Sequence, residues 1–439
     1  MIPDQAEQIA LRLKANLPSF LSRISPSSLV EAHLRRFPPP QDLPSPQAVI
    51  SLGKAGAGLT FRLSRLFRIP PEQTLTILPT DYPSPPPEFP RLTGPHPVPD
   101  QQSLRTLDGI REFVHSLSSR TPVVVAISGG SSSLVADPVP PVTIREKALM
   151  TRRLMEAGAP IEVINTVRIH LSRIKGGGLL SLIAPRPSLT YILSDIPGRS
   201  SGLVGSSLMF PVRRNGPRVL RVLEGWLSGN IPPSVRSVLE GDSLPDFSGL
   251  NSSINRDGGI VASSDTLLPL AQEVFIDGAS FGPLPMHVLT GELKGESREA
   301  GQVLASQILW TTRMTRQGSV WLCSGETTVH LADGKGTGRG GRSLELGLSL
   351  AMALSEIEAV VFCLATDGWD GNSALAGMIA TTRQFSDPSL MLKAHQALSL
   401  HDTAPFLEEH GMEVRTGQTG TNLNDLLVVI VPNFKEGLS

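Results

Sequence analysis

The 439-residue chain has few cysteines, few aromatic residues and no excess of either charge. Its two cysteines, Cys323 and Cys363, lie inside apolar, strand-like runs. We interpret them as buried thiols in a reducing compartment, and not as a disulfide framework or a metal site. Lysine and arginine number 39 against 40 aspartates and glutamates, with no basic stripe interleaved with aromatics. The composition therefore argues against a nucleic-acid partner.

Long apolar runs are missing as well. No segment approaches the roughly 20 apolar residues that a membrane-spanning helix needs. The N-terminus, "MIPDQAEQIALRLKANL", is amphipathic with charges throughout and lacks the apolar core of a signal peptide. We therefore expect a cytoplasmic protein with no membrane partner.

Short buried strands alternate with helical segments along the chain, as at 48–52 and in "TPVVVAIS" and "LTYILSD". This alternation predicts an α/β fold of two domains, each a mostly parallel, Rossmann-like sheet flanked by helices. The apolar rhythm breaks over 241–259, so we predict domains at 1–245 and 246–439. Ligands of such sheets bind beyond the carboxyl ends of strands, which places the expected active site in the cleft between the domains.

Glycine-rich turns carry a lysine at two places. "SLGKAGAGL" (51–59) sets Lys54 between a strand and a helix, and "SRIKGGG" sets Lys175 before three glycines. Glycine lets the backbone approach a ligand closely, and a lysine adds a full charge that suits phosphate. An ordinary turn or helix cap is the structural alternative for both.

Further polar residues follow the other strands. "SGGSSS" supplies the N–H groups and hydroxyls of an anion nest, and a plain strand-to-helix turn explains it equally well. His96 in "HPVPD" either orients a ligand or packs. Arginine at a helix start, as in "GRGGRSLE", binds phosphate or carboxylate, and a solvated surface loop is the structural alternative. The carboxylates of "TDGWDG" suit Mg²⁺ or a hydroxyl proton, and a plain Asp-Gly turn is an equally good local interpretation. The candidate residues from these motifs are Ser128, Gly129, Gly130, Ser131, Asp195, Glu326, Arg342, Asp367, Asp370, Asn422, Asn424 and Asp425.

The familiar nucleotide and metal fingerprints are absent. There is no G-x-x-x-x-G-K-[ST], residues 53–58 read G-x-x-G-x-G, and neither H-E-x-x-H nor paired C-x-x-C occurs. Any phosphate chemistry must use other loops.

Nine motifs, in this order, resemble those of the class II glycerate kinases (the MOFRL family, glycerate 2-kinases). They are "GKAGAGL", "GPHPVPD", "ISGGSSSL", "RIHLSRIKGGGL", "ILSDIPG", "SGETTV", "GRGGRSLEL", "ATDGWDGNSALAG" and "TGQTGTNLNDL". The resemblance covers nearly the whole chain. It implies transfer of the γ-phosphate of ATP to a hydroxyl of D-glycerate, usually giving 2-phosphoglycerate, with Mg²⁺.

The resemblance also implies roles for the candidate residues. Lys54 acts at the reacting phosphate, with Arg342 as its partner from the second domain. Asp195 binds the metal, and one of Asp367 or Asp370 orients or deprotonates the acceptor hydroxyl. The nucleotide-binding residues are Ser128, Gly129, Gly130, Ser131, Lys175, Glu326, Asn422 and Asp425.

Three positions depart from the family pattern. Arg199 stands where an acid is expected and the following "SGPT" turn is lost, Ser343 replaces an asparagine, and the strand at 260–264 ends in "ASS". Replacing an acid by arginine moves a metal or anion site. A kinase for another small hydroxy acid and a non-catalytic metabolite-binding relative therefore stay as alternatives. A hydroxypyruvate reductase is less favoured because no dinucleotide fingerprint follows a strand, and a homodimer is one alternative for the assembly.

Overall fold

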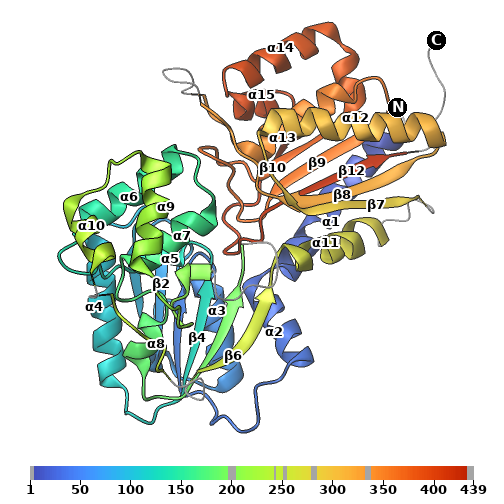
Figure 1. Cartoon of the computed structure of the whole chain (residues 1–439). Coiled ribbons are helices and arrows are strands. Elements are labelled where there is room, and N and C mark those ends of the chain that lie inside the picture. Colours follow the sequence, from blue (N-terminus) through green and yellow to red (C-terminus); the bar gives the residue numbers. More distant parts are fainter. Residues whose placement is uncertain are drawn as a thin grey trace. The chain divides into compact units, whose positions relative to one another are not determined.

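The computed structural model describes residues 4–195, 204–241, 244–250, 255–277, 284–331 and 338–432. The chain divides into two compact units: an N-terminal unit of residues 26–262 and a C-terminal unit of residues 1–25 with 263–439. Within the described residues, each unit contains one six-stranded sheet flanked by helices (Figure 1). The prediction of two α/β domains is confirmed. Arg199 lies outside the described residues.

The sheet of the N-terminal unit is wholly parallel. Its strands β1, β2, β4 and β5 are buried along their whole length, as expected of near-continuous apolar sequences in which Val, Ile and Leu are the commonest residues. In spatial order the strands are β3 (Arg91–Gly94), β2 (Thr74–Pro79), β1 (Ala48–Leu52), β4 (Val123–Ser128), β5 (Ser188–Leu193) and β6 (Asn255–Ala262).

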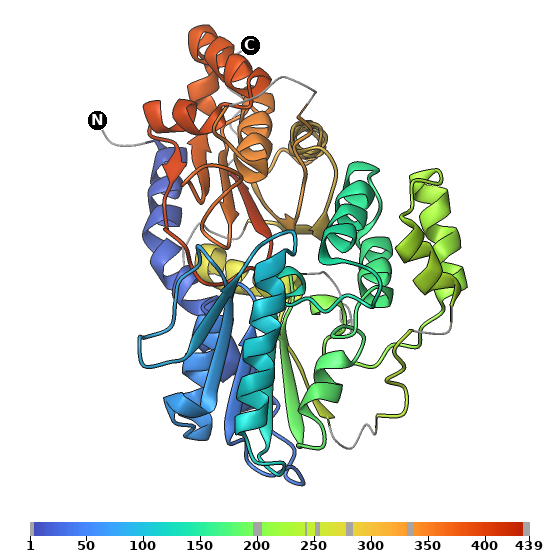
Figure 2. The same cartoon turned by 90° about the vertical axis from the view of Figure 1, so that its left-hand side faces the viewer.

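Helices cover this sheet and form a separate layer beside it. Those packed close to the strands are α2 (Pro26–Arg36), α3 (Gly56–Phe67), α4 (Gln101–Ser116), α5 (Ser131–Leu134) and α8 (Gly178–Ile183). The second layer, the green and yellow-green helices on the right of Figure 2, has its own core around Met150, Leu154 and Leu223. It consists of α6 (Ile144–Glu156), α7 (Ile161–His170), α9 (Gly216–Leu227) and α10 (Pro233–Glu240).

The sheet of the C-terminal unit differs from the prediction. Only β7 and β8 pair in parallel; the other described pairings are antiparallel. Two strands run opposite to their neighbours: β12, which lies between β8 and β9, and β10, which pairs with β9 and β11. In spatial order the strands are β11 (Glu413–Val414), β10 (Gly377–Thr381), β9 (Val360–Ala365), β12 (Asp425–Val431), β8 (Ser319–Gly325) and β7 (Met286–Leu293).

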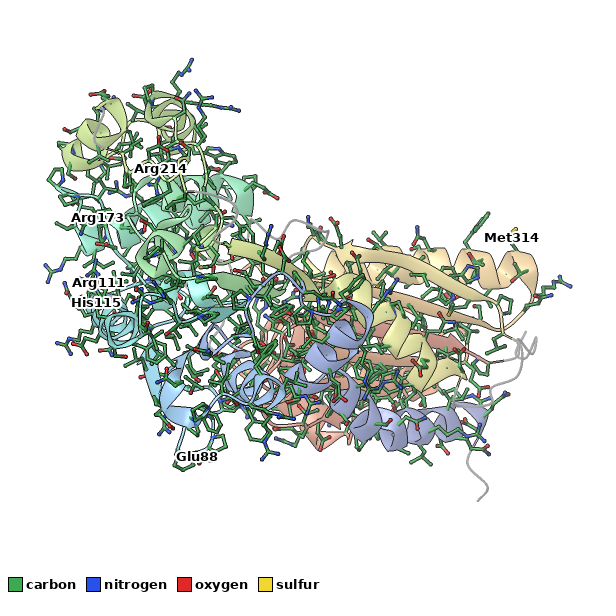
Figure 3. The ribbon with its side chains drawn as sticks, turned by 90° about the horizontal axis from the view of Figure 1, so that it is seen from below. Glu88, Arg111, His115, Arg173, Arg214 and Met314 are labelled. Carbon is green, nitrogen blue, oxygen red and sulfur yellow. The ribbon has the colours of Figure 1, made fainter. Side chains whose placement is uncertain are left out.

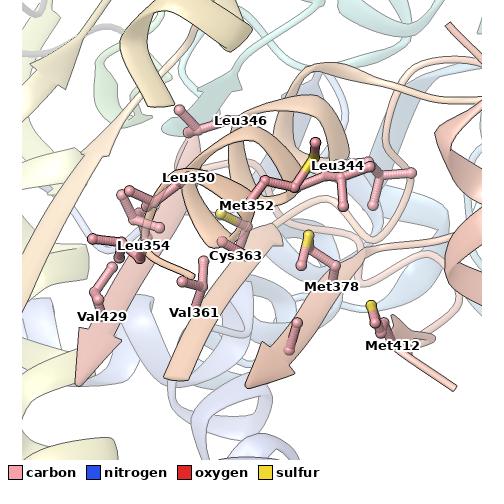
Figure 4. Packing of buried hydrophobic residues seen from close by; sticks show 14 of the residues in the cluster. Leu344, Leu346, Leu350, Met352, Leu354, Val361, Cys363, Met378, Met412 and Val429 are labelled. Carbon is pink, nitrogen blue, oxygen red and sulfur yellow. The ribbon is translucent and has the colours of Figure 1, made fainter. Parts of the chain in front are cut away.

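Helix α13 (Arg342–Ala353) forms the centre of the C-terminal core. Its residues from Ser343 to Met352 are buried, and its leucines pack on β9, β10 and β12 (Figure 4). Both cysteines are free and buried, as predicted. The other helices are α1 (Gln5–Arg23), α11 (Ser264–Ala271), α12 (Ser297–Thr315), α14 (Pro388–Ser399) and α15 (Thr403–Glu409). None of the described helices has the length and apolarity to cross a membrane.

The predicted boundary after residue 245 differs from the observed division at both ends. Strand β6 lies beyond that boundary but pairs in parallel with β5, which places it in the N-terminal sheet. Helix α1 belongs to the C-terminal unit, because Phe20 packs on Phe275, whose ring in turn contacts Phe362. Strand partners and helix packing, which a local loss of periodicity does not reveal, set the division.

Candidate active site

Ser128 joins two glycine turns at the carboxyl ends of β1 and β4. Its hydroxyl accepts a hydrogen bond from Ala55 N (3.1 Å) and donates to the Leu52 carbonyl (3.1 Å). Lys54 N donates to the Gly129 carbonyl (2.9 Å). Gly53 has φ +112°, and a Cβ there would lie 2.4 Å from the Ser128 hydroxyl. The Ser128 side chain therefore fixes the Lys54 turn, and its hydroxyl is engaged within the fold.

Three predicted residues meet at the next two glycines. A Cβ on Gly129 would lie 2.0 Å from Oδ2 of Asp195, and a Cβ on Gly130 would lie 3.3 Å from Cγ of Lys54 and 3.0 Å from the His96 ring. The half-buried Lys54 ammonium lies over the Tyr82 ring, 5.4 Å from its centroid. Glycine is thus required here so that a lysine, a carboxylate and an imidazole reach one turn.

Lys175 supports this turn from within the protein. Its ammonium is buried and donates to the carbonyl (2.6 Å) and hydroxyl (2.8 Å) of Ser132. The Ser131 hydroxyl is buried with no described hydrogen-bond partner. Direct contact of Lys175 with nucleotide stays a prediction; the contacts observed make it a residue that positions the "SGGSSS" turn.

In the C-terminal unit, Arg342 begins α13 and is held by two carboxylates. Its Nε and Nη2 bond Asp425 (2.7 and 3.2 Å), and its Nη1 bonds Glu326 (2.6 Å). Burial alone lowers the pKa of Arg342, but Asp425 and Glu326 outweigh it and raise the pKa. The guanidinium is therefore permanently charged and fixed in orientation.

The two aspartates of "TDGWDG" occupy different environments. Asp370 is buried and accepts a hydrogen bond from Leu344 N (2.8 Å), so it caps α13 beside the Arg342 turn. Burial, with the nearby Asp425 charge, raises its pKa to about 7. Asp367 is half-buried, and its carbonyl accepts from Thr419 N. Of the two, Asp367 is the more accessible to a substrate.

The segment "TGQTGTNLND" reaches the same sheet edge because β12 is antiparallel. Asp425, the first residue of β12, pairs with Gly325 and Ala365, the last residues of β8 and β9. Thr366 stabilises the position of this segment, because its hydroxyl donates a hydrogen bond to the Asn424 carbonyl (2.7 Å). Asn422 Oδ1 accepts from Asn424 N (3.3 Å). The C-terminal candidates Glu326, Arg342, Asp370 and Asp425 are thus brought together.

The sequence analysis missed several residues that shape these turns. Thr366 stood inside a quoted motif, and Tyr82 lay in "DYPSPPPEFP", a stretch that its prolines mark as a connector. Ser132, which anchors Lys175, was also within a quoted motif. Each needed a contact distant in sequence to reveal its role.

Comparison with known proteins identifies the chain's relatives. A family described as "Domain of unknown function (DUF4147)" matches residues 12–240, and the MOFRL family matches residues 319–425. A D-glycerate 2-kinase of Thermotoga maritima is 33% identical over 345 residues, covering 76% of this chain and 78% of that protein. A relative in Agrobacterium vitis that carries a hydroxypyruvate reductase name is also 33% identical, covering 77% of each chain.

The fold is likewise shared with a solved protein. The crystal structure of glycerate kinase from Thermotoga maritima superposes with a TM-score of 0.77 at 26% identity, covering 97% of this chain and 99% of that one. The fold and the ordered motifs together define a two-domain α/β protein with cation-bearing turns. The chain belongs to the MOFRL-type glycerate kinase family.

Proposed function

We propose that the protein is an ATP-dependent kinase that phosphorylates D-glycerate, giving 2-phosphoglycerate. The observation that carries the proposal is the turn where Lys54, Gly129, Gly130 and Asp195 meet, at the carboxyl ends of parallel strands. Phosphoryl transfer depends mainly on positioning and on positive charge around the transferring group. A lysine at a glycine turn supplies both.

We assign each residue a role in the reaction from the contacts that surround it. Lys54 contacts the transferring phosphoryl group, and the N–H groups around Gly129 and Gly130 bind phosphate oxygens. Arg342, held by Asp425 and Glu326, supplies a second oriented cation to the same reaction. Asp367 orients the acceptor hydroxyl and accepts its proton.

The residues near the "SGG" turn suit Mg²⁺ bound together with ATP. Mg²⁺ is usually held by one or two carboxylates, with substrate phosphates and waters completing the shell. Asp195 provides such a carboxylate beside Gly129. Among the described residues, no group of three or more His, Cys, Asp or Glu side chains forms a closed metal site. When bound, the ion would neutralise phosphate charge.

We assign the protein to the cytoplasm, in keeping with the two buried free thiols. We also propose a homodimer whose interface is the outer face of α12. On this face Val303, Trp310 and Met314 are 60–66% exposed. Antiparallel pairing of two copies of α12 would bring Glu299, near its start, close to Arg313, near its end, an arginine that also pairs with Glu356 of its own chain. The molar mass in solution tests this assembly.

The deciding experiment measures ADP release with Mg-ATP and D-glycerate, for wild type beside Lys54→Ala and the exposed control Lys393→Ala. We expect Lys54→Ala to lower kcat/KM by about a thousandfold, since a charge that contacts the transferring group contributes several kcal/mol, and Lys393→Ala to match wild type. Phosphorus NMR identifies the product, because a 2-phosphate couples to one proton. Wild-type protein that releases no ADP would overturn the proposal, and oxidation of NADH by hydroxypyruvate would favour the reductase instead.

A further inference from the structure

Four basic side chains are gathered inside the N-terminal unit, and among the described residues no carboxylate lies within ion-pair distance of them. They are Lys147 of α6, Arg168 of α7, Lys175 and Arg214, named here the cationic cluster. Burial, followed by the charges of Arg168 and Arg214, lowers the pKa of Lys147 to about 7. Burial, followed by Lys147 and Arg168, likewise lowers the pKa of Lys175. The members are therefore close enough to repel one another.

Three members of the cluster donate hydrogen bonds to uncharged carbonyl and hydroxyl oxygens. Arg214 donates to the carbonyls of Ile169, Ser172 and Lys175 at 2.7–2.8 Å. Lys175 donates to Ser132, and Lys147 to the Leu171 carbonyl. These bonds satisfy most of the donors, although the buried Nε of Arg214 has no described partner, and none of the accepting groups carries a negative charge.

Two carboxylates act on the cluster without forming an ion pair with it: Asp246 on Arg214, and Asp137 on Lys147. Asp137 also bonds Arg111 (2.9 Å) and Arg173 (2.5 Å). These two arginines, labelled with Arg214 in Figure 3, are not members of the cluster. In the described part of the chain, no ion pair joins a carboxylate to any member of the cluster. Buried charge without a counterion is costly, so a natural partner is an anion from outside the protein.

Arg168 is the member positioned to receive that anion. It is half-buried and, within the described residues, has neither a hydrogen bond nor an ion pair. It lies three residues after Asn165 on the same face of α7, and Asn165 accepts from the Ser206 hydroxyl (2.9 Å). Ser206 contacts the Ser132 hydroxyl (2.8 Å), which also bonds Lys175. Arg168 thus borders the network beneath the "SGGSSS" turn.

We propose that Arg168 binds the carboxylate of the acceptor hydroxy acid, beside the buried Lys147 and Lys175. This inference rests on the proposed kinase function. The reaction brings two kinds of anion, phosphate and carboxylate, and the turn with Lys54 already suits the phosphates. The planar guanidinium matches a carboxylate in a two-pronged hydrogen bond, whereas both lysines are too deeply buried to touch it.

The test is steady-state kinetics of Arg168→Ala and Arg168→Lys, with D-glycerate and Mg-ATP varied in turn. We expect Arg168→Ala to raise KM for D-glycerate about 10- to 100-fold, as loss of one or two charged hydrogen bonds requires. KM for ATP should stay within about twofold, and guanidinium ion should restore part of the lost affinity. Arg152→Ala, an exposed arginine of α6, is the matched control.

The outcomes separate this inference from the proposed function. A rise in KM for ATP would mean that Arg168 binds phosphate, and unchanged KM values would mean that it binds neither; both overturn the inference while the kinase stands. Glyceramide, which lacks the charge, should discriminate poorly between wild type and Arg168→Ala. If wild type shows no turnover, the kinase proposal fails, and calorimetric binding of D-glycerate without ATP then tests Arg168 alone. Should Arg168→Ala melt below the assay temperature, Arg168→Lys is measured in the same way.

Discussion

The two units present a cation by different physical means. Lys54 is placed through its backbone: two glycine turns at neighbouring parallel strands bond each other through Ser128 and the Gly129 carbonyl. Arg342 is placed through its side chain, by a two-pronged bond to Asp425 and a third bond to Glu326. A backbone scaffold keeps the lysine side chain adjustable, whereas an ion-pair scaffold fixes the arginine and couples it to the stability of the sheet.

The largest expected effect follows from that coupling. Asp425→Asn removes the buried partner of Arg342 and should cost about 3 kcal/mol of unfolding free energy, because the guanidinium loses its buried counterion and keeps only the exposed Glu326. Lys54→Ala should change stability by less than about 0.5 kcal/mol, as its turn is held by backbone. Denaturant unfolding of both variants measures the contrast.

Glu326→Gln provides the control for Asp425→Asn. Glu326 bonds the same guanidinium, but its side chain is 54% exposed against 9% for Asp425. An exposed pair contributes about 1 kcal/mol or less. Equal losses of unfolding free energy in Asp425→Asn and Glu326→Gln would show that the burial of Asp425 does not set the strength of the ion pairs to Arg342. The proposed difference between the backbone scaffold of Lys54 and the ion-pair scaffold of Arg342 would then be wrong.

The sequence predicted the N-terminal arrangement well because parallel strands share one carboxyl edge. Lys54, Gly129 and Asp195 each follow a strand, so topology alone brings them together. The C-terminal sheet was predicted less well, since nothing local in "DLLVVIVP" marks an antiparallel strand. The motif before β12 still reached the right edge, because reversal of the strand put its start beside the ends of β8 and β9.

The sequence could not predict the roles of residues whose side chains are buried by tertiary packing. Asp370 was a candidate for proton transfer by its spacing, yet it is buried and caps α13. Lys175 was a candidate for phosphate contact, yet its ammonium bonds Ser132. Burial depends on tertiary packing, so motif spacing identifies a loop more reliably than it identifies which side chain faces the ligand.

A smaller effect tests the backbone scaffold of Lys54. Gly53→Ala forces a Cβ to within 2.4 Å of the Ser128 hydroxyl at a φ of +112°, so both the clash and the strained backbone oppose it. We expect a loss of about 2 kcal/mol in stability and a fall in kcat, because the lysine turn moves away from the Gly129 carbonyl. Thermal melting and ADP release report the two effects separately.

The matched control is Gly225→Ala in α9, where an added Cβ meets nothing within 4 Å. Alanine in a helix is favoured over glycine, so this variant should be stabilised by about 0.5 kcal/mol with unchanged activity. If Gly53→Ala behaved like Gly225→Ala, the two turns would not be locked together, and Lys54 would need another source of placement.

The last expected effect is a pH dependence that belongs to the ion-pair scaffold alone. Folding raises the pKa of Asp370 from 3.8 to about 7, so between these values the folded protein keeps a proton that the unfolded chain releases. Its stabilising contribution is complete below pH 3.8 and is lost as the pH rises through 7. Asp370→Asn keeps an acceptor for Leu344 N but cannot ionise. The unfolding free energy of this variant should therefore rise steadily relative to that of wild type across that window.

Asp387→Asn, at the exposed cap of α14, shows whether loss of a cap charge alone has this effect. A gap between wild type and Asp370→Asn that stays constant with pH would mean that Asp370 is ionised in the fold, and that Arg342 balances two buried carboxylates instead of one.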